Sequence, residues 1–302
     1  MERDPFLCAG PTILNISGGR TSGYMLRRHL DAHGGTLPDD VHAVYANTGR
    51  ERRETLDFVA EMASRWGVEI RWIERRAKGA WAEVDYESAA RDGEPFAELV
   101  AEKRYLPNAV ARFCTQELKI KTAAGFMRAQ GYDRWTSVLG LRADEARRVV
   151  SVRGRDHGEW DVSCPLFDAR ITRADVDAFW RAQPFDLALQ SYEGNCDLCF
   201  LKGRLRRERI MREHPELASW WIEQEERIGG RFHAHEKGYR RTLNMVLAQG
   251  ALDFGDAAAA DEDADTIPCT CTERRRPKRC TCHKKPRRGH TLACAFQWGE
   301  AA

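Results

Sequence analysis

The chain has 302 residues, of which 42% are hydrophobic and 31% charged, a composition typical of a globular protein that can bury a core. The net charge of +2 hides a near balance of 48 basic and 46 acidic residues. No run of eighteen apolar residues occurs, which excludes a transmembrane helix. The first ten residues show no apolar signal core, so the ten cysteines predict metal or redox chemistry in a cytoplasmic protein rather than a disulfide scaffold.

Short apolar runs alternate with helical periodicity over the first 75 residues. Strands are predicted at 11–16, 42–47 and 68–73, with a helix after each of the first two and Gly67 ending the second helix. Strand–helix alternation at this spacing predicts a parallel sheet with crossover helices.

Later segments continue this α/β pattern. We expect an irregular, largely helical stretch after residue 73, then a helix at 115–130, a strand at 135–139 and further strands in 147–153 and 159–166. Thr172 is expected to cap a helix that Pro184 stops, and helices are expected over 203–249. The sequence thus predicts a doubly wound α/β catalytic unit over residues 1–250 with a helical C-terminal portion, followed by an acidic and then basic, cysteine-rich tail over 251–302.

A glycine-rich loop follows the first predicted strand and opens the first helix. In that position glycines let a phosphate approach the backbone, and amide N–H groups at the helix N-terminus face the anion. A Gly-Gly turn by itself is weak support, because most such turns bind nothing. The predicted nucleotide-binding loop consists of Ser17, Gly18, Gly19, Arg20, Thr21 and Ser22.

This SGG-x-x-S loop resembles the PP-loop of the ATP-pyrophosphatase and phosphoadenosine phosphosulfate (PAPS) reductase superfamily. Asn47-Thr48-Gly49 with Glu54-Thr55 is similar to the Asp-Thr-Gly…Glu-Thr segment of that family, and residues 140–145, GLRADE, are similar to its Gly-x-Arg-x-x-Glu loop. The resemblance covers about residues 11–210 and is strongest to the small PAPS reductase-like proteins of phages and prophages. It implies an adenine nucleotide α-hydrolase-like fold that binds ATP or PAPS with Mg²⁺, and it adds Asn47, Thr48 and Gly49 to the nucleotide-binding residues.

The resemblance also implies catalytic roles, for Ser17, Lys119, Arg142 and Glu145. Arg142 would meet the anionic end of the substrate, Glu145 would orient it or bind metal, and Lys119 either meets phosphate or is simply solvated. Three departures from the family pattern stand out: Arg20 and Thr21 replace lysine and aspartate, Asn47 replaces an aspartate, and the Glu-Cys-Gly-Leu-His segment of true PAPS reductases is missing.

Four cysteines of the catalytic unit are candidate metal ligands. The C-x-x-C pair, Cys196 and Cys199, lets two sulfurs reach one centre. Related adenylylsulfate reductases hold a [4Fe–4S] cluster with such a pair and a distant Cys-Cys; Cys114 matches one of those two cysteines, and Cys164 is the candidate fourth ligand. An iron–sulfur cluster, a zinc ion and metal-free thiols all remain open. Cys8, which precedes the first predicted strand, is expected to be a buried or idle thiol.

The tail contains two C-x-C pairs among many arginines and lysines. Cys269, Cys271, Cys280 and Cys282 could enclose a zinc ion in a basic knuckle that binds nucleic acid, or the tail could be solvated chain without metal. For the whole protein, the favoured hypothesis is an ATP-dependent enzyme that adenylates an acceptor, releases pyrophosphate and inserts sulfur, with nucleic acid as a reasonable acceptor and a separate protein as a sulfur donor. The alternatives are a PAPS or adenylylsulfate reductase, and a non-catalytic nucleotide- or nucleic-acid-binding module with structural zinc.

Overall fold

Residues 4–194 and 196–249 are described by the computed structural model, and within them six strands form one sheet in the order β4-β3-β2-β1-β5-β6. Neighbouring strands are parallel except for β4, which pairs antiparallel with β3 at the edge. The fold is therefore of the predicted α/β class. The strands are β1 (Thr12–Ile16), β2 (Val41–Asn47), β3 (Ile70–Arg75), β4 (Trp81–Val84), β5 (Trp135–Val138) and β6 (Trp160–Ser163).

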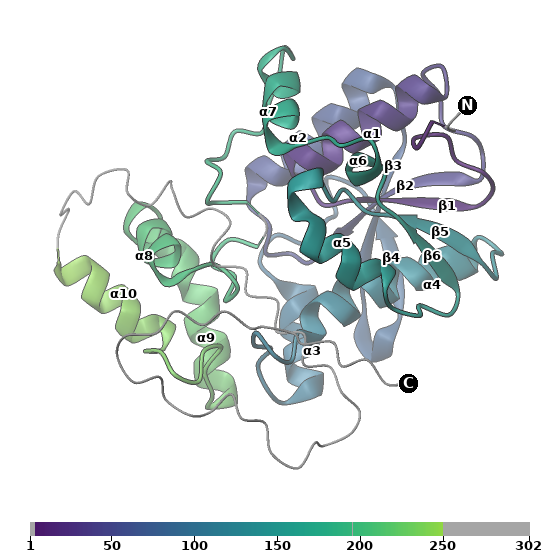
Figure 1. Ribbon diagram of the computed structural model, residues 1–302. Coiled ribbons are helices and arrows are strands. Elements are labelled where there is room, and N and C mark those ends of the chain that lie inside the picture. The colour runs from purple at the N-terminus through teal and green to yellow at the C-terminus, as the bar shows by residue number, and fades with distance from the viewer. Residues whose placement is uncertain (1–3, 195, 250–302) are drawn as a thin grey trace, which may run out of the picture. The chain divides into compact units, whose positions relative to one another are not determined.

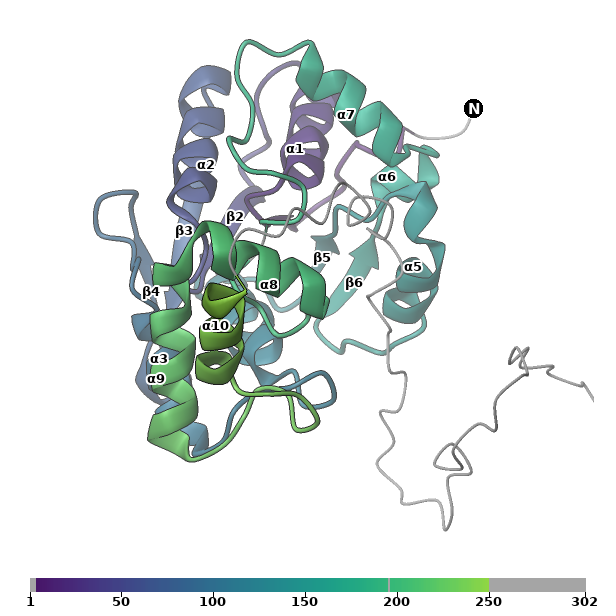
Figure 2. The same cartoon turned by 90° about the vertical axis from the view of Figure 1, so that its left-hand side faces the viewer.

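Helices cover both faces of the sheet, so the sheet is doubly wound as predicted (Figure 1). The helices α1, α2 and α7 pack on one face and α4 on the other, while α8, α9 and α10 gather with α3 beside the sheet (Figure 2). The α-helices are α1 (Arg20–Ala32), α2 (Arg53–Trp66), α3 (Glu94–Lys103), α4 (Thr122–Ala129), α5 (Ala146–Arg153), α6 (Pro165–Asp168), α7 (Arg173–Arg181), α8 (Arg204–Glu213), α9 (Ala218–Ile228) and α10 (Tyr239–Ala248). A π-helix, η2 (Thr115–Lys121), precedes α4, and three short 3₁₀ helices are η1 (Ala77–Gly79), η3 (Ala143–Glu145) and η4 (Pro215–Leu217).

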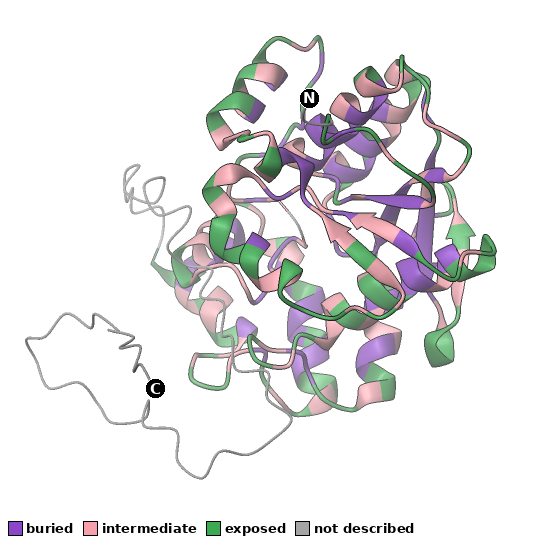
Figure 3. Cartoon of the chain, turned by 45° about the vertical axis from the view of Figure 1, so that its right-hand side comes forward, coloured by how far each residue is buried: buried purple, intermediate pink, exposed green. Residues whose placement is uncertain are grey.

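Alternation along the central strands divides the core into two layers, because successive side chains point to opposite faces. Leu14 and Tyr45 pack under α1 and α2, whereas Ile13, Val44 and Ile73 pack under α4. The strands β1, β2 and β3 are accordingly mostly buried, whereas the outer strands β4 and β6 are half-buried or exposed (Figure 3). No described helix combines the length and apolar composition needed to cross a membrane.

Two sequence predictions were wrong. The 147–153 segment, expected as a strand, lies in helix α5, because Val149 and Val152 share one inward helical side while Val150 is 72% exposed. The second error is β4, missed in the stretch after residue 73. It is antiparallel because Arg76–Ala80 is too short for a crossover, and Arg76 N–H bonds to Ala80 O at 2.7 Å.

The strand predicted over 159–166 is shorter than expected, because β6 ends at Ser163 and Pro165 begins α6. The other element predictions are confirmed. Gly67 ends α2 in a left-handed conformation, and Thr172 caps α7 in a capping box with Asp175. All described residues belong to one compact unit of the chain. The predicted tail over 251–302, with Cys269, Cys271, Cys280 and Cys282, lies outside the described residues and stays a prediction.

Candidate functional site

The predicted nucleotide site lies at β1, where the order in which strands are added to the sheet reverses. From β1 the connection through α1 leads to β2 on one side, whereas β5 lies on the other side of β1. Ligands of open α/β sheets bind in the crevice at the carboxyl ends of strands that diverge in this way. Here that edge carries the 17–22 loop after β1, residues 47–49 after β2 and residues 140–145 after β5.

The 17–22 loop is held in shape by its own serines. Ser17 Oγ donates to Ser22 Oγ at 3.0 Å, and Ser22 Oγ donates to the carbonyl of Gly19 at 2.9 Å. Gly18 has a φ of +76°, and a Cβ there would lie 2.3 Å from Thr55 Cγ2. Gly19 caps α1 without any side-chain hydrogen bond, so the first amides of α1 have no side-chain cap.

Arg20 is engaged away from this loop. Its guanidinium forms a bidentate pair with Asp186, at 2.7 and 2.9 Å, and donates to the carbonyl of Leu187 at 2.6 Å. These bonds hold segment 186–189 beside the start of α1. The predicted phosphate contact of Arg20 would require this pair to open.

Asn47 is fully buried and hydrogen-bonded on both sides of its amide. Its Nδ2 donates to Glu74 Oε1 at 2.6 Å and to the carbonyl of Ala90 at 2.8 Å, while its Oδ1 accepts from the Gly49 N–H at 3.2 Å. An amide can donate to Glu74, which an aspartate cannot do when ionised. The local partner therefore explains this departure from the family pattern, and Asn47 is not placed to hold Mg²⁺.

Arg142 connects the 140–145 loop to the 17–22 loop. Its guanidinium donates to Thr21 Oγ1 at 3.2 Å and pairs with Asp144 at 2.9 Å. Glu145 accepts the Arg142 backbone N–H at 3.1 Å and is paired with Arg148. The structure thus brings Arg142 to the predicted loop and uses Glu145 to fix the conformation of Arg142.

A second cluster lies next to Thr48. Glu51, whose side chain is fully buried, accepts from Thr48 Oγ1 at 2.7 Å and from Lys119 Nζ at 3.2 Å. The Cys196 Sγ lies 3.6 Å from Thr48 Oγ1 and 3.9 Å from Glu51 Oε1. Burial opposes the charge on Lys119, but the nearby Glu51 carboxylate raises the pKa of Lys119, so this cation persists at neutral pH. Lys119 is therefore paired rather than simply solvated.

Three of the four predicted cysteine ligands come together. Burial, and then the neighbouring Cys199, raise the pKa of the Cys114 thiol to about 11, and burial also raises the pKa of Cys196 and of Cys199. The Leu201 N–H donates to Cys199 Sγ at 3.5 Å. The sulfur atoms of Cys114, Cys196 and Cys199 do not all lie within 4.8 Å of one another. Among the described residues, only another group of candidate ligands meets this distance limit. Thiolates on one zinc ion are about 3.8 Å apart, so these three sulfurs are not preset for a single zinc ion.

Cys164 is not part of this cluster. It follows β6, whereas Thr48 follows β2, and β1 and β5 lie between those strands. Three strand spacings amount to roughly 14 Å. Cys164 is buried instead with Leu141 and Val149 under α5. The structure therefore leaves three cysteines where the sequence predicted four.

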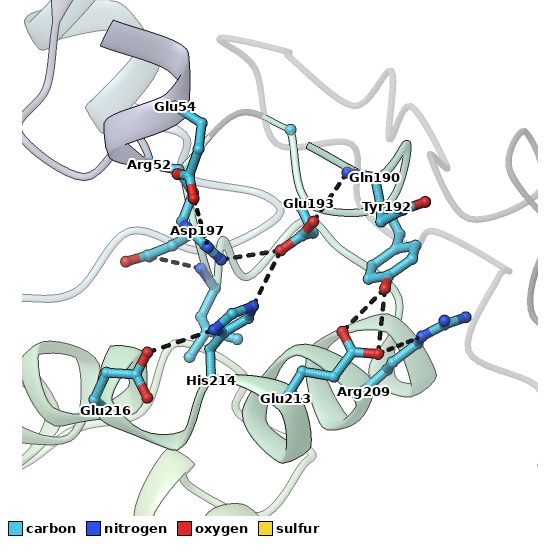
Figure 4. A network of polar contacts seen from close by, with 12 residues as sticks. Arg52, Glu54, Gln190, Tyr192, Glu193, Asp197, Arg209, Glu213, His214 and Glu216 are labelled. Carbon is cyan, nitrogen blue, oxygen red and sulfur yellow. Dashed lines mark hydrogen bonds and ion pairs between the residues drawn. The ribbon is translucent and has the colours of Figure 1, made fainter. Parts of the chain in front are cut away.

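Buried and partly buried ion pairs hold the C-x-x-C turn. Asp197 pairs with Arg50 and accepts from Trp221 Nε1 at 2.7 Å. Ahead of the turn, Glu193 accepts from Arg52 at 3.0 Å, and the His214 ring lies 3.5 Å from the Glu193 carboxylate (Figure 4). Sequence reasoning missed Arg50, Glu51 and Asp197. The only signal was their position, directly after Asn47-Thr48-Gly49 or between the two cysteines.

The similarity of the chain to known proteins is low. No protein-family model matches the chain. The uncharacterised nin region protein ORF290 of Escherichia phage lambda is 29% identical over 202 residues, which are 63% of this chain and 66% of that relative, just under two thirds of its length. Among solved structures, the U34-tRNA thiolase NcsA from Methanococcus maripaludis with its [4Fe-4S] cluster matches over 80% of this chain and 74% of its own, at 14% identity and a TM-score of 0.37. At these similarities neither match transfers an activity to this chain.

Proposed function

We propose that the chain is a PP-loop enzyme that adenylates an acceptor oxygen with ATP, releasing pyrophosphate, and then replaces that oxygen with sulfide-level sulfur from a donor, releasing AMP, with the help of an iron–sulfur cluster that Cys114, Cys196 and Cys199 would hold. The observation that carries the proposal is the meeting of the 17–22 loop, Arg142 and the three-cysteine cluster at one edge of the sheet. Thr48 links the two parts, because it follows β2 beside the loop and contacts Cys196.

Charge stabilisation on the departing pyrophosphate would come from the chain itself. The uncapped amides and the dipole of α1 favour an anion at Gly19, and Arg142 adds a positive charge beside Thr21. Because Asn47 is occupied within the protein, Mg²⁺ would arrive on the nucleotide phosphates.

The donor set around the cysteines suits a cluster with three protein ligands. Such a cluster supplies an iron site that can hold the sulfur to be transferred. Two lysines lie next to the thiols and would offset thiolate charge: Lys119 pairs with Glu51, and Lys202 donates to the carbonyls of Tyr192 and Glu193 at 3.3 and 3.2 Å. Glu51 keeps Lys119 charged and beside Cys196.

For the acceptor we propose nucleic acid. A cavity of about 520 Å³ at the start of α10 is lined by Arg231, Lys237, Arg240 and Arg241 with Glu236, a surface suited to a phosphate backbone. The first residue of α10, Tyr239, donates its hydroxyl to the carbonyl of Leu198 at 2.6 Å, inside the C-x-x-C turn. The basic cavity is thereby attached to the cysteine cluster.

The test starts from anaerobically purified full-length protein. We expect iron and sulfide near the content of a cubane cluster, lost in Cys196→Ala and retained in Cys164→Ala, which is the matched control. We expect pyrophosphate release from ATP only when RNA or DNA is present, and its loss in Ser17→Ala. Sulfite release from PAPS would instead establish a reductase. Tight nucleotide binding with neither product, in a protein that contains only zinc, would establish a binding module.

A further inference from the structure

A group of metal-ligating side chains lies away from the site described above. Among the residues that the structure describes, only Cys8, His29 and His33 bring three such ligand atoms within 4.8 Å of one another. The two histidines are four residues apart at the C-terminal end of α1, where His29 lies in the last turn and His33 follows the helix, and Cys8 comes from the segment before β1. This is a ligand set typical of zinc.

Individual distances agree with one shared ion. Cys8 Sγ lies 3.6 Å from His29 Nδ1. A sulfur and a nitrogen that share one tetrahedral zinc ion, with bonds of about 2.3 and 2.0 Å, are themselves about 3.6 Å apart. The backbone N–H of Cys8 donates to His33 Nε2 at 3.2 Å, which places the cysteine beside the second histidine. That bond uses the lone pair of Nε2, so an ion bound to this nitrogen would replace it.

The surroundings favour a cation. His29 lies in the last turn of α1 and His33 is its C-cap, where the helix dipole is negative. The carbonyl oxygen of Phe6 lies 2.7 Å from His29 Nδ1 and accepts its proton in the metal-free protein. A metal ion on Nδ1 would replace that proton, and the Phe6 carbonyl would have to turn aside, because an ion about 2.0 Å from Nδ1 in this direction would overlap its oxygen. The other nitrogen of His29, Nε2, is buried and has no hydrogen-bond partner, so it can receive the displaced proton.

We propose that Cys8, His29 and His33 form a binding site for a thiophilic divalent cation such as Zn²⁺, which fastens the N-terminal segment to the end of α1. Binding releases the Cys8 thiol proton, and the fourth ligand position is left to water. Phe6 inserts into the core beneath this segment, so the ion would secure a buried anchor. The 13-residue helix α1 separates the site from the 17–22 loop by about 20 Å. The inference is therefore independent of the proposed reaction.

The experiment uses full-length protein stripped with EDTA. Zn²⁺ is added while the thermal midpoint is followed, and Co²⁺ reports thiolate coordination by its charge-transfer absorbance. We expect Cys8→Ala and His33→Asn each to weaken one zinc site by at least about 10–100-fold, since even outer-shell partners of metal ligands account for that much. Each should also remove one equivalent of bound Co²⁺. Cys164→Ala and His157→Asn are the matched controls and should keep that equivalent.

A double substitution separates this site from zinc bound elsewhere in the chain. Cys8→Ala with His33→Asn should remove no more metal than either single change, because losing one ligand already empties the site. An unchanged Co²⁺ stoichiometry in either single variant, or additive losses in the double variant, would overturn the proposal. Midpoints in EDTA show whether each variant folds. If Cys8→Ala does not fold, His33→Asn decides alone, because His33 is only partly buried at the end of the helix.

Discussion

At position 47, the buried neighbour Glu74 favours an amide side chain over a carboxylate. Glu74 is itself buried and also accepts the Ala90 N–H at 2.7 Å. A carboxylate at position 47 would face the Glu74 carboxylate across 2.6 Å, where both cannot be ionised.

We therefore predict that Asn47→Asp, which introduces the residue usual in the PAPS reductase-like proteins that the sequence resembles, destabilises this protein. The expected loss in the free energy of unfolding is about 3 kcal/mol at pH 7, because one buried carboxyl must stay protonated or remain uncompensated. Urea unfolding measures it. Asn47→Asp with Glu74→Gln should recover part of the loss, because it removes the second carboxylate while the Ala90 carbonyl still lacks its donor from position 47. A wild-type stability for the single variant would show that the pair is not buried as described.

Because His29 is buried, we predict that the free energy of unfolding decreases in acid. Burial lowers the pKa of His29 from 6.5 to about 4. Between these values the unfolded chain binds a proton that the folded chain rejects, so the stabilising contribution is complete above pH 6.5 and disappears as the pH falls to 4. The free energy of unfolding should fall by about 3 kcal/mol over this window.

Urea unfolding in EDTA from pH 7.5 to 4 tests this. His29→Asn should flatten the pH dependence, whereas His157→Asn should keep it. The same slope in His29→Asn and the wild type would assign the acid sensitivity to other groups.

At the level of elements, the loop between β1 and α1 depends on contact with α2. Gly18 needs a positive φ and also has no room for a Cβ beside Thr55. Thr55 belongs to the Glu-Thr pair that the sequence singled out, and its packing against the loop gives that pair a structural reason.

Gly34 is a matched control for this contact, since its φ is +70° but nothing lies within 4 Å of a Cβ built there. We predict that Gly34→Ala costs about 1 kcal/mol, from backbone strain alone. Gly18→Ala should cost roughly 1–3 kcal/mol more and weaken nucleotide binding, because the added methyl group displaces α2 or the loop. Thr55→Ser removes the opposing methyl and should restore part of both. Equal costs at the two glycines would refute the packing argument.

On the scale of the whole molecule, the topology unites residues from distant parts of the chain. Thr48, Cys114 and Cys196 meet because β2, η2 and the C-x-x-C turn all reach the same side of the sheet. The helical C-terminal portion is attached to that site through Trp221, whose indole bonds to Asp197, and through Tyr239.

If nucleic acid is the acceptor, its binding should depend on salt and on the α10 cavity. We predict that Lys237→Glu with Arg241→Glu weakens binding of single- and double-stranded probes by tenfold or more at low salt and reduces the slope of log K against log salt by about 2. Arg134→Glu, exposed at the start of β5, should change neither quantity. Fluorescence anisotropy over a salt series gives both values. An unchanged slope in the double variant would place the acceptor elsewhere.

Local pattern was sufficient for most of the fold. Short apolar runs between helical segments located β1, β2, β3 and β5, and turn chemistry located the ends at Gly67 and Thr172. The same reasoning failed at 147–153, where three valines fit either a strand or one side of a helix and burial decided between them. It also failed at β4, whose four residues are too few to show a period.

The sequence by itself determined the α/β class, the loop between β1 and α1 and the C-x-x-C pair, because each rests on residues adjacent in the chain. Only the tertiary structure decided that Cys164 lies apart from the other cysteines, that Arg20 pairs with Asp186, and that Glu51 holds Lys119 beside Cys196. The same holds for Cys8, which the sequence predicted to be a buried or idle thiol and which lies with two histidines at the end of α1. These relations join segments separated by tens of residues, and the distances between them are set by strand order and helix packing, which no local spacing encodes.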